Sequence, residues 1–420
     1  MPATHSLAPQ QKLLEDYVHT RKMTMKMIEP LEIEDFGVQA MEDVSPPKWH
    51  LAHTTWFFEE FILTKYRSGY NYYLEEAKKL FNSYYETLGK PFPRSKRGLI
   101  GRPTVNTILA YRKAVDEEIT SLLRRNEVIS EEILSLIRLG LQHEQQHQEL
   151  LITDIKYNFS INPLYPAFQK EVHSLNTVED VSEMKWTSIA EGLATIGTNE
   201  ENFSFDNERP AHKEYLYPFS IALRPVTNKE FQEFIGDGGY TTPEHWLSDG
   251  WSTVKEEGWK APLYWEEIDG VWHYFTLSGL QPVRDHDPVT HVSYYEADAF
   301  ARWAGCRLPS EQEWECAFKN DPSSGQFLDS FELQPTMSEG TSAFGTVWEW
   351  TKSPYMPYPE SARPAGALGE YNAKFMSNQL VLRGGSCATP ENHIRLTYRN
   401  FFHPDKRWQF SGIRLAKDRR

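Results

Sequence analysis

The segment from His143 to Glu149 carries the residues of this chain best suited to metal chemistry. It reads His-Glu-Gln-Gln-His-Gln-Glu, so His143 and His147 stand four positions apart. Leucine and isoleucine recur at three- and four-residue steps from Ile137 to Ile155, which predicts an amphipathic helix. Residues four apart lie one above the other on a helix, so both imidazoles can reach one metal ion. This spacing is compatible with two different metals and two different chemistries.

The first interpretation is a zinc peptidase. The segment satisfies the His-Glu-x-x-His pattern, in which Glu144 would be the general base. A third ligand is then needed, but Leu150 and Thr153 occupy the positions where metzincins carry Gly and His. Glu171 lies beyond two prolines, outside any helix that continues from the motif. The zinc interpretation is disfavoured, and two histidines on a polar helix face with no metal remain the plain alternative.

A third ligand is available upstream, in the segment Trp-His-Leu-Ala-His that ends at His53. His53 lies one helical turn from Trp49 and from Phe57, on the aromatic face expected to point inward. His50 shares that face only in part, so His53 is the preferred ligand. Three imidazoles with open positions beside them suit non-haem iron(II), which binds a substrate and dioxygen together. In that case Glu144 is not a base but a surface or bundle residue.

Four predicted helices must position these histidines. Their expected ranges are Gln10–Ile28, a helix that begins at Pro47, Thr104–Arg125 and Ser130–Tyr157. Helices of this length predict a four-helix bundle over residues 1–160, a fold in which metal sites are built from facing side chains. A long connection from Tyr66 to Pro103 separates the second and third helices, and connections of that length are usually functional.

The long connection contains two groups of candidate residues. Tyr84 and Tyr85 are adjacent, and Arg94 and Arg97 follow in a stretch with nearby glycines. Adjacent tyrosines are often packing residues, and a basic stretch is often a solvated face. Paired guanidiniums also bind carboxylates well, and glycine lets the backbone approach a ligand. A role for the arginines in binding a substrate carboxylate is therefore expected.

The second half of the chain has a different character. Residues 161–185 are expected to form a linker, and residues 186–420 an irregular α+β domain of short strands between turn residues. Two stretches in this domain are expected to be helical, Thr227–Ile235 and Ser293–Ala304. The fold class is therefore α + (α+β).

Composition limits the partners. The chain has 420 residues, a net charge of −15 and three cysteines. Nucleic-acid binding needs clustered Lys and Arg, so it is not expected. No recognisable signal peptide and no stretch of 18 apolar residues is present, so we expect no membrane partner and a cytoplasmic location. The few cysteines favour a reducing compartment. The sequence is silent on oligomeric state.

Several motifs together carry a family resemblance. The second half contains Arg383-Gly-Gly-Ser, Gly345-Thr-Val-Trp-Glu-Trp and Arg399-Asn-Phe-Phe, and resembles the formylglycine-generating-enzyme domain, a C-type-lectin-like fold. The helical half resembles DinB-like metal-binding bundles. The combination resembles the ergothioneine-pathway sulfoxide synthases, which are iron(II) enzymes. They use dioxygen to join the thiol of a cysteine donor to carbon 2 of the imidazole of hercynine, a trimethylated histidine.

The resemblance assigns roles to individual residues. The iron ligands would be His53, His143 and His147. Gln146 would contact the hercynine carboxylate, and Asn400 with its neighbours Phe401 and Phe402 would line the substrate site. Arg94 and Arg97 would hold the carboxylate of the sulfur donor. Tyr84 and Tyr85 would form an active-site pair in which a phenol supplies a proton or an electron.

Two departures from the family patterns refine this assignment. Members that use γ-glutamylcysteine carry Asp and Arg where this chain has Phe402 and Lys406, so the resemblance implies free L-cysteine as the donor. Formylglycine-generating enzymes bind copper through two cysteines, where this chain has Thr389 and Ile394, so that activity is not expected. The remaining alternatives are an ovothiol-type synthase acting on histidine, a selenoneine synthase and a non-enzymatic lectin-like binding module.

Overall fold

The computed structural model describes residues 8–125, 128–169, 183–321, 325–337, 343–362, 369 and 371–419. The chain forms two compact units. The helical unit comprises Met1–Asn162 and Gly366–Tyr371, and the mixed unit comprises Pro163–Ala365 and Asn372–Arg420. Of the expected linker 161–185, residues 170–182 lie outside the described residues.

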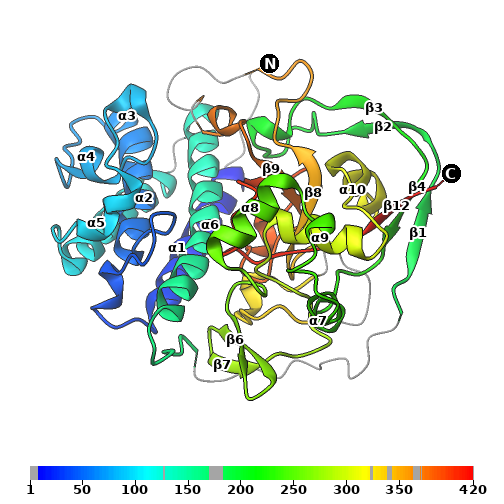
Figure 1. Cartoon of the computed structure of the whole chain (residues 1–420). Helices are drawn as coiled ribbons and strands as arrows, with labels where there is room; N and C mark the ends of the chain where they lie inside the picture. Colours follow the sequence, from blue (N-terminus) through cyan, green and yellow to red (C-terminus); the bar gives the residue numbers. More distant parts are fainter. Residues whose placement is uncertain are drawn as a thin grey trace. The chain divides into compact units, whose positions relative to one another are not determined.

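The helical unit is built from four long helices (Figure 1). Its helices are α1 (Ala8–Ile28), α2 (Pro47–Phe58), α3 (Thr64–Tyr66), α4 (Ala77–Phe81), α5 (Val105–Leu123) and α6 (Glu131–Ser160). Helix α2 begins with Pro47 in its first turn, where the missing N–H costs nothing. All of its residues are buried, and it packs against both α5 and α6. The second helix of the chain is therefore the centre of the bundle.

Two features of α6 hold these helices together. Gly140 on α6 faces α2, and a Cβ atom there would lie 2.6 Å from the Phe58 ring, so glycine permits the close approach. Glu144, fully buried on α6, accepts hydrogen bonds from Arg21 Nη1 at 2.7 Å and Thr24 Oγ1 at 2.6 Å on α1, and one from Arg112 on α5. Glu144 is thus a bundle residue that ties α1, α5 and α6 together, and not a surface residue.

The mixed unit contains four helices and four small sheets among its described residues. The helices are α7 (Asn228–Gly236), α8 (Ser248–Glu257), α9 (Tyr294–Trp303) and α10 (Glu311–Phe318). The strands are β1 (Trp186–Ile189), β2 (Gly192–Ile196), β3 (His212–Leu216), β4 (Phe219–Ala222), β5 (Trp265–Ile268), β6 (Val271–Thr276), β7 (Gly279–Pro282), β8 (Trp348–Pro354), β9 (Leu380–Arg383), β10 (Asn400–Phe402), β11 (Ser411–Gly412) and β12 (Ala416–Asp418). The sheets have the strand orders β1-β4-β12, β10-β9-β8-β11, β2-β3 and β5-β6-β7.

The expectation of two helices in this unit was wrong, because α8 and α10 are also present. Both are short, so each shows few turns of apolar periodicity. Helix α8 contains Gly250, a weak helix former that packs against Tyr295. Helix α10 has a readable start, since Ser310 and Glu313 form a capping box.

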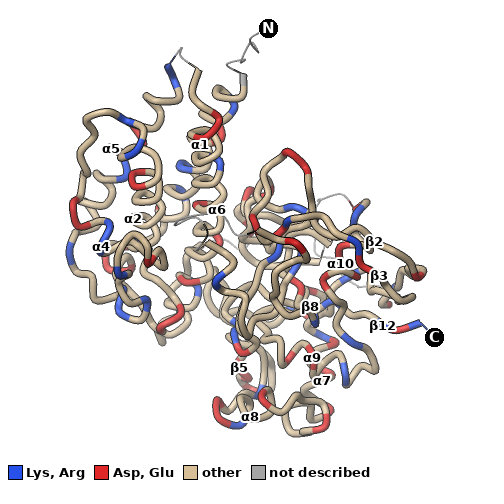
Figure 2. Tube along the Cα trace, turned by 90° about the horizontal axis from the view of Figure 1, so that it is seen from above, with Lys and Arg blue, Asp and Glu red and all other residues tan. Residues whose placement is uncertain are grey.

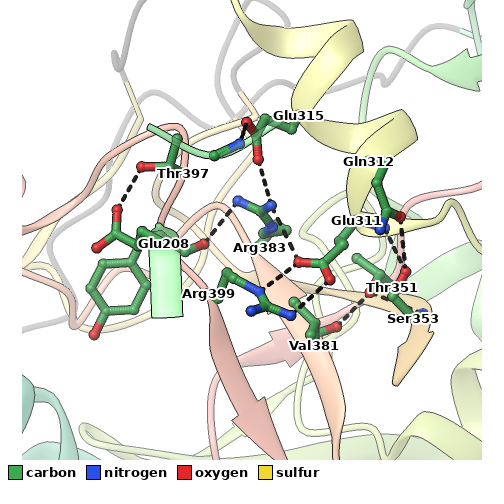
Figure 3. Close-up of polar contacts among 12 residues, drawn as sticks. Glu208, Glu311, Gln312, Glu315, Thr351, Ser353, Val381, Arg383, Thr397 and Arg399 are labelled. Atoms are coloured by element: carbon green, nitrogen blue, oxygen red, sulfur yellow. Dashed lines mark hydrogen bonds and ion pairs between the residues drawn. The ribbon is translucent and has the colours of Figure 1, made fainter. Parts of the chain in front are cut away.

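Helix α10 matters because its carboxylates position β10. Glu311 accepts from Arg399 Nε at 2.8 Å and Nη2 at 2.9 Å, and Glu315 accepts from Arg383 Nη2 at 2.6 Å (Figure 3). These side chains are almost fully buried. Arg399 directly precedes Asn400, so its bidentate ion pair with Glu311 fixes the start of β10.

Charges of both signs are interspersed along the described trace (Figure 2). Among the described helices, none has the length and apolar character required to cross a bilayer.

Candidate metal centre

Three histidines from two helices converge inside the helical unit. His53 comes from α2, and His143 and His147 come from successive turns of α6. One ring nitrogen of each lies within 4.8 Å of those of the others. The Nε2 atoms of His53 and His143 are 3.1 Å apart. The structure therefore brings together the three residues predicted as ligands.

Hydrogen bonding and packing prepare His53 to bind a cation. Its Nδ1 donates to the carbonyl oxygen of Phe81 at 2.5 Å, so the lone pair is on Nε2, the atom that faces His143. The ring stacks on Trp49, with centroids 4.5 Å apart and planes inclined by 14°. Both contacts fix the direction in which the free nitrogen points.

Burial keeps the three imidazoles neutral. Desolvation lowers the pKa of His53 and of His147 well below 6.5, and the neighbouring His143 lowers both further. Desolvation also lowers the pKa of His143 to about 3. Neutral imidazole is the form that binds metals, and three such nitrogens facing one another suit zinc, iron or copper. The donor set therefore fits a divalent transition-metal ion.

His50 does not join the triad. Its Nδ1 lies 2.9 Å from His147 Nδ1, and its Nε2 lies 3.0 Å from Asp154 Oδ2. The other ring nitrogen of His147, Nε2, is thereby left for a metal. The structure agrees with the choice of His53 over His50 as the upstream histidine of the cluster.

Tyr84 and Tyr85 lie in the same unit, a few residues after Phe81, whose backbone carbonyl is hydrogen-bonded to His53. Their hydroxyls are 3.4 Å apart, and their ring centroids 4.5 Å. Asn82 shapes the turn, since its side chain accepts from Tyr85 N and donates to Tyr85 O, both at 2.9 Å. The carbonyl that holds His53 belongs to Phe81, at the start of this turn. Tyr85 is fully buried and Tyr84 partly exposed.

Arg94 and Arg97 form part of one short 3-10 helix, Arg94–Leu99, but differ in environment. Arg94 is exposed, whereas Arg97 is 6% exposed, and its guanidinium carbon lies 3.4 Å from the Trp49 ring centroid. Arg97 Nη1 donates to Ser45 Oγ at 2.9 Å, but its Nε has no hydrogen-bond partner among the described residues. Burial and then the nearby Arg94 charge lower the pKa of Arg97 well below its usual value. A buried guanidinium that lacks a hydrogen-bond partner at Nε is stabilised by an anion.

Gln146 has a neighbour that the sequence did not indicate. Tyr371, which the structure groups with the helical unit, donates its hydroxyl hydrogen to Gln146 Oε1. The Tyr371 ring also lies edge-on to His143, with centroids 5.8 Å apart, and 6.2 Å from Tyr84. Gln146, His143 and the tyrosine pair are therefore connected through a residue far away in the sequence.

The remaining candidates, Asn400, Phe401 and Phe402, form β10 of the mixed unit. Phe401 stacks on Tyr355 with centroids 4.0 Å apart, and Phe402 packs edge-on to Trp408. Lys406 pairs with its neighbour Asp405 at 3.1 Å. The structure thus places this group and the histidine triad in different units.

Comparison with known proteins matches both units to families. The DinB superfamily matches residues 16–151, and the sulfatase-modifying factor enzyme 1-like domain matches residues 171–344 and 341–419. The hercynine oxygenase of Mycobacterium tuberculosis is 34% identical over 307 residues, covering 66% of this chain and 70% of that protein. The chain belongs to the hercynine oxygenase family.

Other members of the family extend the match. The hercynine oxygenase of Mycolicibacterium thermoresistibile is 29% identical over 441 residues, which cover 97% of this chain and 95% of that protein. That of Mycolicibacterium smegmatis is 38% identical over 249 residues, covering 52% of this chain and just 57% of that protein. The match to the family spans both units, as the resemblance in the sequence implied. The chain is therefore an enzyme of the oxidoreductase class.

Proposed function

We propose that this protein is an iron(II)- and dioxygen-dependent sulfoxide synthase that joins the thiol of L-cysteine to carbon 2 of the hercynine imidazole. The reaction removes one hydrogen from the carbon and one from the thiol, and forms one C–S bond. One oxygen atom goes to sulfur and the other leaves as water. Dioxygen thereby accepts four electrons, two from C–S bond formation and two from oxidation of the sulfur. The product is hercynylcysteine sulfoxide.

The observation that carries the proposal is the triad of neutral imidazoles in a chain of this family. His53, His143 and His147 would hold the iron, which when bound would supply the redox chemistry with dioxygen and the site at which the substrates meet. Anaerobic loading with iron(II), followed by oxygen-uptake measurements with hercynine and cysteine, tests the proposal. Oxygen uptake that requires both substrates supports it, and uptake that is independent of hercynine contradicts it.

The tyrosine pair and Gln146 would act on the substrates. Burial of Tyr85 against Trp56 and Phe61 excludes water from one side of the pair, with ring centroids 5.9 Å and 5.2 Å away. The hydroxyl contact between Tyr84 and Tyr85 offers a route by which a proton can reach the reacting sulfur or oxygen. Gln146, held by Tyr371, would orient the hercynine carboxylate through its amide N–H.

Arg97 is proposed to bind the carboxylate of the sulfur donor. Because its buried Nε is unpartnered among the described residues, Arg97→Gln should lower kcat/KM for cysteine by about 10–100-fold, the value of a lost charged hydrogen bond. The loss should appear mainly in KM, measured by steady-state oxygen uptake. Lys96→Gln, an exposed cation of the same short helix, is the matched control. Equal effects of the two substitutions would contradict this role.

Phe402 predicts the identity of the thiol donor. A phenyl ring cannot form an ion pair with the ammonium group of a γ-glutamyl residue, and Lys406 already pairs with Asp405. We expect kcat/KM to be higher for free cysteine than for γ-glutamylcysteine, by roughly tenfold for one missing charged contact. The double change Phe402→Asp and Lys406→Arg should shift the preference toward γ-glutamylcysteine. A wild-type preference for γ-glutamylcysteine would overturn this assignment.

A further inference from the structure

The contacts of His50 and Asp154 have no place in the function proposed so far. His50 lies on α2 and Asp154 on α6, and the two side chains are 3% and 1% exposed. Asp154 Oδ2 lies 3.0 Å from His50 Nε2, and His50 Nδ1 lies 2.9 Å from His147 Nδ1. A continuous line of hydrogen bonds therefore runs from a buried carboxylate to one imidazole of the triad.

We propose that His50 and Asp154 are positioning residues that fix the tautomer of His147 and make it the most strongly donating ligand of the metal centre. The inference rests on the proposed metal centre and adds two residues to it. It concerns how the protein sets the electron density of one ligand, and not which residues bind the ion.

The positions of the hydrogens follow from the contacts. An imidazole that gives Nε2 to a metal keeps its hydrogen on Nδ1, so His147 donates to His50 Nδ1. His50 must then carry its own hydrogen on Nε2, where it donates to Asp154 Oδ2. The other neutral tautomer of His50 would place two N–H groups against each other at 2.9 Å. One arrangement satisfies every contact, and all its donors point toward the carboxylate.

The three triad residues differ in what their Nδ1 atoms meet. His53 donates to a neutral backbone carbonyl, that of Phe81. His143 Nδ1 is buried with no hydrogen-bond partner among the described residues. Among the contacts within the described part of the chain, His147 alone of the three meets a side chain that leads to a carboxylate. An acceptor on the second nitrogen of a ligating imidazole raises its basicity. His147 has such an acceptor in His50, which is itself made more basic by donating to the Asp154 carboxylate, so His147 is the strongest donor of the set.

The Asp154 carboxylate is also linked, through Ser45, to Arg97, the residue proposed to bind the sulfur donor. The backbone N–H of Ser45 donates to Asp154 Oδ2 at 2.8 Å, and Ser45 Oγ accepts from Arg97 at 2.9 Å. Ser45 lies just before α2 and holds both groups. Hydrogen bonds therefore link Asp154 to His147 through His50 and to Arg97 through Ser45. The negative charge of Asp154 offsets the positive charge of the buried Arg97 guanidinium.

The arrangement can be tested without any substitution. The full-length protein is loaded with zinc(II) as a diamagnetic probe, and the histidine tautomers are read from long-range ¹H–¹⁵N NMR spectra. We expect hydrogen on Nδ1 of His147 and on Nε2 of His50. Hydrogen on Nδ1 of His50, or on Nε2 of His147, would overturn the proposal.

Substitutions test the effect on metal binding. Asp154→Asn keeps an acceptor oxygen but removes the charge, and His50→Phe breaks the line of hydrogen bonds. Each should weaken cobalt(II) binding, measured by competition with a chelating dye, by about 10–100-fold, and should shift the visible cobalt spectrum. His50→Gln can still accept from His147 and donate to Asp154, so it should restore most of the affinity.

The matched control is Asn158→Ala, one turn further along α6. Asn158 donates to Val38 O at 3.0 Å and accepts from Ala40 N at 2.9 Å, and neither of these hydrogen bonds involves an imidazole. Asn158→Ala should bind cobalt(II) as the wild type does. Wild-type affinity in both Asp154→Asn and His50→Phe would overturn the proposal. A wild-type protein that binds no metal would overturn the metal centre itself, whereas metal binding without hercynine turnover would overturn only the proposed reaction.

Discussion

His53→Phe strongly weakens metal binding and activity while the helical unit stays folded. Phenylalanine keeps an aromatic ring on Trp49, where the wild-type imidazole stacks at 4.5 Å, but it has no nitrogen to give to a metal. If a binding free energy on the order of 10 kcal/mol is shared among three or four ligands, losing one costs about 2.5–3.3 kcal/mol and weakens binding roughly 70- to 300-fold. Oxygen uptake should fall at least as far. Anaerobic titration with iron(II) and oxygen uptake on the same sample measure both effects.

His19→Ala is the control for this substitution. His19 is an exposed histidine on α1, so its loss removes an imidazole from the helical unit without touching the triad. The control should retain wild-type metal affinity and activity. If His53→Phe bound iron(II) as tightly as His19→Ala does, the triad would not be the metal centre.

Glu144→Gln destabilises the protein by about 3–5 kcal/mol, the usual cost of breaking a buried ion pair from one side. Glu144 is fully buried and accepts hydrogen bonds from Arg21, Arg112 and Thr24. A neutral amide leaves two buried guanidiniums with too little negative charge nearby. Urea unfolding followed by circular dichroism measures the loss. Glu131→Gln, which removes an exposed carboxylate of the same helix that pairs with Arg138, should cost less than about 1 kcal/mol.

The Glu144 carboxylate also predicts a pH dependence of stability. Despite the opposing effect of burial, which is the largest single influence, Arg112 and Arg21 lower its pKa from 4.5 to about 2 in the folded protein. The unfolded chain therefore takes up the proton first as the pH falls. The stabilisation is fully present above pH 4.5 and is lost progressively toward pH 2. For Glu144→Gln, the free energy of unfolding should fall less steeply than in the wild type between pH 4.5 and pH 2. Unchanged stability together with loss of a zinc-dependent peptide cleavage would instead favour the general-base role of the zinc-peptidase interpretation.

The sequence predicts the parts of this centre that follow local rules. The four-residue step from His143 to His147 predicts two imidazoles on one helix face. The aromatic residues around His53 predict that its side chain points into the core of the bundle. The structure brings these three residues together. The four long helices were expected for the same reason, because their apolar residues repeat over several turns.

Other parts depend on contacts that no local pattern encodes. Tyr371 and Gln146 are 225 positions apart, and no periodicity links them. Asp154 lies on the expected helix, but its importance appears only when α2 places His50 between it and His147. Periodicity does not predict helix α10, because eight residues show few apolar repeats, although its capping box indicates a helix start.

The most direct test of the central claim is mass spectrometry of the product formed under ¹⁸O₂. Iron(II)-loaded protein is incubated with hercynine, histidine, cysteine and γ-glutamylcysteine together. We predict a hercynine–cysteine conjugate, linked at carbon 2 of the imidazole, that carries one ¹⁸O atom on sulfur. A conjugate of histidine, a product without ¹⁸O, or disulfide as the sole oxidised thiol would contradict the proposed function.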